Sequence, residues 1–390
     1  MNEVRIGIAG VGNMGSGHAS QILAGNIKNL RLAAVCDIAP AKMDGFAAPV
    51  KKFTDSRKMI RSGEIDAILV ATPHYGHTTI GVDAFENGLH VLTEKPISVH
   101  PKDARKLIDA HKAAKKRNKK TVFSAMFQQR TLPMYIKLRE MLRRGDLGQV
   151  TRVNWIITNW FRSHAYYASG GWRATWKGEG GGVLLNQCPH NLDLLQWITG
   201  MPAKMCAFCN LGKFHDIEVE DEVTAYFEYP NGATGVFITT TGEAPGTNRL
   251  EICGDLGRVV CENGKIAFTR NLTPMREFSK TTPHSFACPE VWNIDVPFNG
   301  WGGQHNEILQ NFTNAILDGT PLIAPAEEGI NAVELACGML YSSFTGKTVD
   351  LPLDADAYER HLKKLIAGSK DKKDVREGGV VSLDGSSNIK

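Results

Sequence analysis

Residues 4–15, VRIGIAGVGNMG, decide the fold of the first part of the chain. An apolar run over residues 4–9 leads directly into Gly10, Gly12 and Gly15, which form a G-x-G-x-x-G motif. In such a motif the first glycine makes a tight turn, the second lets the backbone approach a pyrophosphate, and the third lets a helix pack closely on a strand. Asp37, at the end of the next predicted strand, is placed to accept hydrogen bonds from a ribose. The stretch therefore predicts a dinucleotide-binding βαβ unit.

Short apolar runs alternate with longer helix-compatible segments from residue 4 to about residue 126. This alternation is typical of parallel βαβ units, and continuous apolar runs are typical of strands that are covered on both faces. The predicted strands cover residues 4–9, 32–36, 67–71, 90–93 and 121–126. We therefore expect an α/β protein whose first domain, residues 1–126, is a Rossmann-type, doubly wound parallel sheet.

The dinucleotide is expected at the carboxyl edge of this sheet, because ligands of doubly wound folds bind there. Asp37 would repel a 2′-phosphate, and Ile38 and Ala39 offer no cation to hold one, although Lys42 is close in sequence. We therefore expect NAD in preference to NADP. The residues predicted to bind it are Gly10, Gly12, Asn13, Met14, Gly15, Asp37, Thr72, His74, His77, Glu94, Lys95 and Pro96.

Beyond residue 126 the pattern changes to alternating strands separated by turns. Turn residues separate segment 223–229 from 233–241, and segment 258–262 from 265–269, which predicts two hairpins. Helices are predicted over roughly residues 182–199, 304–317 and 327–345. Residues 127–367 are therefore expected to form an α+β substrate-binding and oligomerisation domain with a large, mostly antiparallel open sheet, followed by a polar tail at 368–390.

Charge and composition exclude several classes of protein. The 45 basic and 41 acidic residues leave a net charge of +4, which is too small over this length for a dedicated nucleic-acid binder. No run approaches the roughly 18 apolar residues of a membrane span, and no export signal precedes the first strand, so we expect a cytoplasmic protein without membrane contact. Cys206 and Cys209 form a single C-x-x-C, which cannot close a tetrahedral site, so no metal is expected.

Two further motifs stand near the predicted cofactor site. Glu94-Lys95-Pro96 follows the fourth predicted strand, and the glycine triplet 180–182 is followed by Asn186 and His190. With the glycine motif at residues 10–15, these residues resemble the Gfo/Idh/MocA family of sugar and cyclitol oxidoreductases, over roughly residues 3–350. The resemblance implies oxidation of a secondary hydroxyl with His190 as the base and Lys95 assisting it. It also implies a cis peptide bond before Pro96.

The predicted catalytic residues are Lys95, Asn186 and His190. A histidine suits proton transfer near neutral pH, and a lysine beside a cationic nicotinamide would have a lowered pKa and could relay the proton. On one helix Asn186, His190 and Asp193 would share a face, and Pro189 would kink or restart that helix. Members of the family often have an aspartate in place of Asn186, so we expect this chain to lack a charge there.

Aromatic residues cluster between Trp155 and Trp176, and aromatic faces pack against the C–H faces of sugar rings. For each single aromatic, a place in the sheet core or at a subunit interface is expected equally with a place in the pocket. Arg130 and Asp221 are further candidates to line the pocket. The residues predicted to bind substrate are Lys95, Gln129, Arg162, Trp172, Arg173, Asn186, His190 and His305.

Three functions remain open from the sequence. The first is an NAD-dependent dehydrogenase acting on a sugar, glycoside or cyclitol, with carbon three of a glucose-like ring as one option. The second is a cofactor-retaining enzyme that cleaves or epimerises glycosides through a redox step, and the third is a non-enzymatic sensor. Because a sensor needs no proton path, Lys95 and His190 argue against it. An open sheet face favours a homo-oligomer, either a dimer or a tetramer.

Overall fold

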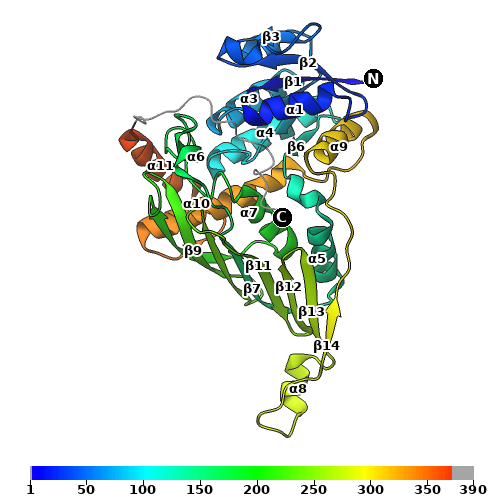
Figure 1. Cartoon of the computed structure of the whole chain (residues 1–390), viewed down its shortest axis with the longest axis vertical. Coiled ribbons are helices and arrows are strands. Elements are labelled where there is room, and N and C mark those ends of the chain that lie inside the picture. The colour runs from blue at the N-terminus through cyan, green and yellow to red at the C-terminus, as the bar shows by residue number, and fades with distance from the viewer. Residues whose placement is uncertain (1, 371–390) are drawn as a thin grey trace.

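The computed structural model describes residues 2–370 and contains two large sheets, one in the upper and one in the lower half of Figure 1. The first sheet has six parallel strands in the order β3-β2-β1-β4-β5-β6. Its strands are β1 (Val4–Ala9), β2 (Leu30–Cys36), β3 (Lys51–Phe53), β4 (Ala67–Val70), β5 (His90–Thr93) and β6 (Phe123–Ala125). The doubly wound sheet is confirmed. The strand order reverses between β1 and β4, which is where ligands of such sheets bind.

The five predicted strands of this sheet are all present, but β3 was not predicted. It contains two exposed lysines and no apolar run, because an edge strand is covered less than a central one. The helices that follow the strands of this sheet are α1 (Asn13–Leu23), α2 (Ser56–Ile60), α3 (Tyr75–Glu86) and α4 (Pro101–Arg117), with the short helix η1 (Pro40–Met43) after β2. A further helix, α9 (Gln304–Asp318), returns from late in the chain to pack near β1.

The second sheet has nine strands in the order β14-β13-β12-β11-β7-β10-β9-β8-β15. Its pairs are antiparallel except for β7 with β10. The predicted hairpins are confirmed as β9–β10 and β12–β13. The strands are β7 (Val150–Ile157), β8 (Lys204–Leu211), β9 (Glu220–Glu228), β10 (Thr234–Thr240), β11 (Asn248–Gly254), β12 (Gly257–Glu262), β13 (Lys265–Asn271), β14 (Val291–Asp295) and β15 (Val349–Asp350).

One face of the second sheet is packed and the other is open. Along β9, Val223, Ala225 and Phe227 are buried, whereas the alternate residues Thr224 and Tyr226 are exposed. Figure 1 shows α7 and α10 between the two sheets. The remaining helices are η2 (Gln128–Thr131), α5 (Pro133–Arg144), α6 (His164–Ala168), α7 (Pro189–Thr199), α8 (Met275–Thr281), η3 (Ala326–Glu328), α10 (Gly329–Thr345) and α11 (Ala355–Gly368).

The predicted helix over residues 182–199 is wrong in its first part. The structure has turns from Gly182 to Cys188, and α7 begins only at Pro189. The buried Glu220 carboxylate accepts hydrogen bonds from the backbone N–H groups of Gly182 (2.8 Å) and Leu184 (3.0 Å), which holds these residues in a turn. Proline is favoured at the first helical position because its missing N–H has no helical partner there. The helices predicted at 304–317 and 327–345 are present as α9 and as η3 with α10.

Within residues 2–370 no helix combines the length and the apolar character that crossing a membrane requires. Residues 371–390, most of the predicted polar tail, lie outside the described residues.

Candidate active site

The three glycines of the first loop have different surroundings. Gly10 has a φ of +88°, and a Cβ there would lie 2.6 Å from the carbonyl oxygen of Ala71. A Cβ at Gly15 would collide with the carbonyl oxygen of Gly10, so the close approach of α1 to the loop requires glycine. At Gly12, in contrast, a Cβ would meet no atom within 4 Å. This space lies at the N-terminus of α1, where backbone N–H groups attract a pyrophosphate.

Polar groups around this loop fit a dinucleotide. Asp37 follows β2, and its carboxylate accepts hydrogen bonds from the N–H groups of Val11 and Ala39, both at 3.0 Å. Lys42 Nζ lies 3.9 Å from Asp37 Oδ1. The Thr72 hydroxyl, after β4, is buried and has no hydrogen-bond partner within the described chain. Because buried polar groups are normally satisfied, Thr72 is a group that a bound dinucleotide would complete.

Two buried histidines, His18 and His77, contact the segment after β5 that contains the Glu94-Lys95-Pro96 motif. Glu94 Oε1 lies 2.7 Å from Nε2 of His18 on α1. Burial alone would raise the pKa of Glu94, but the hydrogen bond from His18 lowers it to about 2. The ring nitrogens of His77 lie 2.7 Å from the Pro96 carbonyl oxygen and 2.8 Å from that of Thr72. The Lys95–Pro96 peptide bond is cis, as expected.

Lys95, Asn186 and His190 come together from distant parts of the chain. Lys95 Nζ donates a hydrogen bond to the main-chain oxygen of Asn186 at 2.7 Å. Burial lowers the pKa of Lys95, whereas the carboxylates of Glu94 and Glu179 raise it. His190 lies on the first turn of α7, and burial together with the charge of Lys95 holds the pKa of His190 well below its usual range. Asn186 precedes this helix, so the predicted helical face shared by Asn186 and His190 is wrong.

His190 also faces the segment that follows β6. Its Nε2 lies 3.3 Å from the side-chain nitrogen of Gln128, and its ring meets that of Phe127 edge to face. Nδ1 of His190 and Oε1 of Gln128 are buried and have no partner within the described chain. A polar ligand at this position would complete both groups.

Two arginines and two aromatic rings stand beside Asn186. The guanidinium groups of Arg162 and Arg173 lie over the Tyr166 ring at 5.2 Å and 4.7 Å. Arg173 also lies over the Trp172 ring at 4.6 Å, and it donates to the Tyr166 hydroxyl at 3.0 Å. Tyr166 in turn donates to Asn186 Oδ1 at 3.3 Å. The half-buried arginines and Trp172 thus form a cationic and aromatic group next to Lys95.

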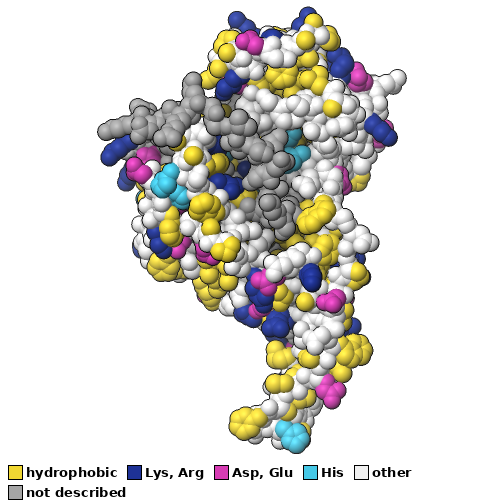
Figure 2. All heavy atoms as spheres, in the orientation of Figure 1, with side chains coloured by type: hydrophobic (Ala, Val, Ile, Leu, Met, Phe, Trp, Pro, Cys, Tyr) yellow, Lys and Arg dark blue, Asp and Glu magenta, His cyan; other side chains and the backbone are white. Residues whose placement is uncertain are grey.

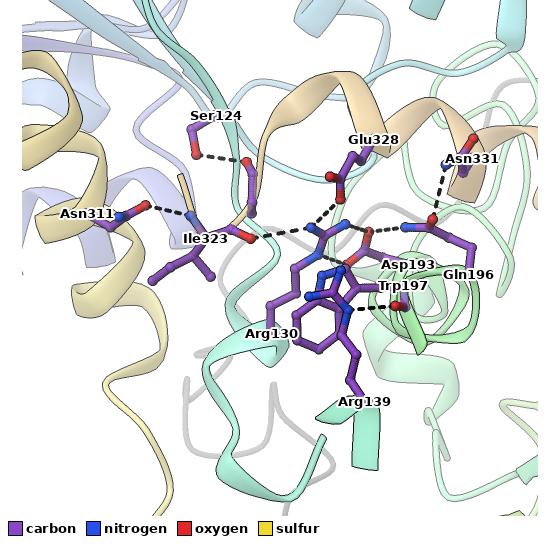
Figure 3. A network of polar contacts seen from close by, with 11 residues as sticks. Ser124, Arg130, Arg139, Asp193, Gln196, Trp197, Asn311, Ile323, Glu328 and Asn331 are labelled. Atoms are coloured by element: carbon purple, nitrogen blue, oxygen red, sulfur yellow. Dashed lines mark hydrogen bonds and ion pairs between the residues drawn. The ribbon is translucent and has the colours of Figure 1, made fainter. Parts of the chain in front are cut away.

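Arg130 and Asp193 are engaged with each other instead of lining a pocket (Figure 3). Arg130 is 1% exposed and donates through two nitrogens to Asp193, at 2.7 and 2.6 Å, and through a third to Glu328 at 2.6 Å. Burial raises the pKa of Asp193, and Arg130 opposes that shift. Asp221 is likewise internal, since its carboxylate accepts from the backbone N–H groups of residues 213–215.

The other predicted site residues lie at the edges of this region. His305 lies in the first turn of α9, and its ring centroid is 5.5 Å from that of His18, on the side of the dinucleotide loop. Burial lowers the pKa of His305 to about 4. His74 donates from Nδ1 to the carbonyl oxygen of Glu179 at 3.1 Å. Gln129 is buried in η2, next to the Gln128 that faces His190.

Sequence reasoning missed Gln128, Glu179 and His18, which all contact the predicted residues. Each stands close to a motif in the sequence, but only the folded chain directs its side chain to the site. Most of the tryptophan cluster proved to be core, because Trp155, Trp160 and Trp176 are at most 4% exposed.

Two models of one family match the chain. A model described as the oxidoreductase family, NAD-binding Rossmann fold, matches residues 4–123, and one described as the GFO/IDH/MocA C-terminal domain matches residues 135–260. The chain is 29% identical to the rhizopine catabolism protein MocA of Rhizobium meliloti, over 51% of this chain and 58% of that protein. It therefore spans little more than half the length of that relative. It is 25% identical to D-glucoside 3-dehydrogenase of Escherichia coli, over 90% of this chain and 98% of that protein.

A solved structure shares the arrangement of both sheets. The WlbA dehydrogenase of Chromobacterium violaceum, in complex with NADH and UDP-GlcNAcA, superposes with a TM-score of 0.77 at 25% identity, covering 91% of this chain and 97% of that one. The parallel sheet and the large mixed sheet are thus those of known NADH-binding proteins.

Proposed function

Because the chain belongs to the GFO/IDH/MocA family of NAD-binding oxidoreductases, we propose that it is a dehydrogenase acting on a secondary hydroxyl of a sugar, glycoside or cyclitol. The single observation that carries this proposal is the hydrogen bond from Lys95 to the turn that precedes His190, since it brings the end of β5 next to the start of α7. The similarity to D-glucoside 3-dehydrogenase favours carbon three of a glucose-like ring.

Oxidation of a secondary alcohol removes a hydride from carbon and a proton from oxygen. The Gly10–Gly15 loop and Asp37 would hold NAD, which would supply the acceptor for the hydride. His190 takes the hydroxyl proton, because its lowered pKa keeps the imidazole neutral. Lys95 donates a hydrogen bond to the same hydroxyl and stabilises negative charge on the oxygen as the proton leaves.

The substrate hydroxyls that do not react are held by Arg162 and Arg173, and Trp172 packs against a C–H face of the ring. Arg173 Nε is buried without a partner in the described chain, which leaves it available to a hydroxyl oxygen. Asp37 favours NAD over NADP, because its carboxylate would repel a 2′-phosphate.

A panel of glucose, glucosides, anhydrosugars and inositols, with NAD and with NADP, tests the proposal through the absorbance of reduced nicotinamide. We expect stoichiometric reduction of NAD by at least one pyranoside or cyclitol. Sugar release without net reduction would instead support a cofactor-retaining, glycoside-cleaving enzyme. Binding of cofactor without turnover of any member would contradict a dehydrogenase.

Lys95→Ala should abolish turnover and change NADH affinity by less than about tenfold, because Lys95 acts at the reacting hydroxyl and not at the pyrophosphate. Affinity is measured by fluorescence titration with NADH. The matched control is Lys115→Ala, which changes an exposed lysine in the last turn of α4 and should leave both quantities unchanged. Undiminished turnover in Lys95→Ala would remove this lysine from the mechanism.

A further inference from the structure

Glu179 is a buried carboxylate in the middle of the candidate site. It lies in the turns before α7 and is 1% exposed. One carboxylate oxygen accepts a hydrogen bond from Asn186 Nδ2, and the other accepts from the backbone N–H of Ala174 at 2.6 Å. Burial raises the pKa of Glu179, and the charge of Arg173 together with the hydrogen bonds from Ala174 and Asn186 opposes that shift. Buried carboxylates are rare unless they have such partners.

Asn186 connects Glu179 to Lys95. Its side-chain nitrogen donates to Glu179, its side-chain oxygen accepts from Tyr166 at 3.3 Å, and its main-chain oxygen accepts from Lys95 Nζ at 2.7 Å. These contacts fix the orientation of the amide. Asn186 itself is uncharged, so the negative charge beside it comes from Glu179.

Lys95 has two carboxylates near it, and both favour its charged form, Glu94 more strongly than Glu179. Glu94 also accepts a hydrogen bond from His18 at 2.7 Å. Glu179 is instead engaged with neutral donors, an amide and a backbone N–H, so its negative charge acts on the cations around it. Those cations are Arg173 and Lys95.

We propose, building on the proposed dehydrogenase function, that Glu179 is a positioning residue that fixes the Asn186 amide and keeps positive charge on Lys95 beside the substrate hydroxyl. It acts through Asn186 and through space, and it does not itself touch the substrate. A charged Lys95 is the better donor to an alkoxide, so the carboxylate favours the state that the reaction needs.

The sign of the effect follows from the groups that face Glu179. Burial lowers the pKa of Lys95, Glu94 and Glu179 raise it, and Arg173 and Arg162 lower it further. Removing the Glu179 charge therefore lowers the Lys95 pKa. The titratable and charged groups around Glu179 are Lys95, Arg173, Tyr166, Tyr167, His74 and Glu220.

The direct test is the titration of Lys95 in the full chain labelled with ¹³C-lysine. The Lys95 Cε resonance is identified by its loss in Lys95→Arg. In Glu179→Gln, which keeps the shape and can keep a hydrogen bond to Asn186, we expect the Lys95 midpoint to fall by about one pH unit. The matched control is Glu334→Gln, because Glu334 is also buried but accepts hydrogen bonds from Arg105 and from the Leu353 N–H instead of acting on the turn that carries Asn186. The control should leave the Lys95 midpoint unchanged.

The double variant Glu179→Gln with Asn186→Asp moves the charge to the neighbouring residue and preserves a donor–acceptor pair between the two side chains. Its Lys95 midpoint should return to the wild-type value or exceed it. If Glu179→Gln is too unstable to purify, the double variant carries the test alone, and a midpoint below that of wild type overturns the proposal. A midpoint that does not move in Glu179→Gln also overturns it.

Kinetics distinguish this inference from the proposed function. With an active substrate, Glu179→Gln should lower kcat by about tenfold and leave KM for NAD within about twofold, and the double variant should recover most of the loss. If no substrate in the panel reacts but the Lys95 midpoint shifts as expected, the dehydrogenase proposal fails and the electrostatic role of Glu179 stands. A tenfold loss of kcat that the double variant does not recover, with an unmoved midpoint, would make Glu179 purely structural.

Discussion

His190 accepts a proton only in its neutral form, so its pKa sets the acid limb of the proposed oxidation. Burial and Lys95 hold this pKa well below the ordinary value of 6.5, so the imidazole stays neutral as the pH falls to 6.5. We expect kcat/KM to remain constant down to that pH and to decline only below it. His190→Ala should remove this limb and lower kcat/KM by about 10²- to 10⁴-fold. The measurement is kcat/KM against pH with the best substrate of the panel.

The control for this prediction is His284→Ala, which changes an exposed histidine between α8 and β14. It should reproduce the wild-type profile. If the limb persists in His190→Ala with its midpoint unmoved, another group of the site accepts the proton.

At the scale of single residues, the sequence predicts the groups next to a motif better than the groups that support them. Lys95 and His190 stand inside recognisable patterns, whereas the role of Glu179 depends on turns that bring it back to Asn186. The charge expected to be missing at position 186 is supplied from position 179, since the two side chains are hydrogen-bonded. No local periodicity encodes such a contact.

In the loop between β1 and α1, substitutions at different glycines should affect either the stability of the protein or its binding of NADH. Gly12 has a φ of −70°, which alanine adopts without strain, and a Cβ there would meet no atom within 4 Å. Gly12→Ala should therefore leave the melting temperature within about 1–2 °C, because nothing in the protein is displaced. It should weaken NADH binding by about tenfold or more, because the new methyl group occupies space reserved for the pyrophosphate. Thermal unfolding and a fluorescence titration check the two halves.

Gly15→Ala is the contrasting variant of the same loop. Its Cβ would collide with the Gly10 carbonyl oxygen, so it should destabilise the fold by about 1–3 kcal/mol before any ligand is added. Equal affinity of Gly12→Ala and wild type for NADH would place the dinucleotide elsewhere.

The anchoring of α7 depends on the buried pair of Arg130 and Asp193 (Figure 3). Arg130→Met leaves Asp193 as an uncompensated buried charge, so we expect a loss of about 3–5 kcal/mol in the free energy of unfolding. The control is Arg139→Met, whose guanidinium lies over the Trp197 ring at 4.0 Å but is partly exposed. This control should cost about 1 kcal/mol. Urea unfolding of both variants measures the difference. Equal losses in the free energy of unfolding would show that the ion pair with Asp193 stabilises the protein no more than the contacts of Arg139 do.

At the scale of elements, periodicity predicts strands and regular helices well, but it does not predict where a helix starts. The apolar runs of β1 and β5 match the structure residue for residue, because both are buried on both faces. Residues 182–188 have helix-compatible composition, yet the Glu220 carboxylate holds them in turns. A long-range hydrogen bond thus overrides the local preference.

At the scale of the whole molecule, the sequence predicts a single boundary at residue 126 between the two halves, each built on one sheet. In the structure the chain returns to the first half after that boundary. Ser124 of β6 forms a bridge with Pro325, and α9 packs near β1, so late segments complete the first half. The division at residue 126 therefore stays a prediction about sequence pattern. These crossings matter for function, because Lys95 follows β5 and His190 lies on α7. The packing between the two halves therefore sets the position of one side chain relative to the other.

The open face of the second sheet carries apolar side chains. Phe208 is 71% exposed and Tyr226 is 42% exposed, and the register places Val236 and Ile238 on the same face. Contiguous apolar sheet surface is typical of subunit interfaces. We predict that the chain sediments as a dimer or a tetramer at micromolar concentration, and that Phe208→Asp lowers the sedimenting mass with little change in melting temperature.

A second exposed region must be separated from this face. The segment from α8 to β14 projects from the end of the sheet (Figures 1 and 2); α8 has no buried residue, and Phe286 is fully exposed. Phe286→Asp is therefore the matched control, since it places the same charge on the projecting segment. An interface on the sheet face must desolvate the aspartate of Phe208→Asp but not that of Phe286→Asp, so only the former should dissociate the oligomer. Dissociation by Phe286→Asp alone would move the interface to the projecting segment, and a monomeric wild-type chain would contradict oligomerisation altogether.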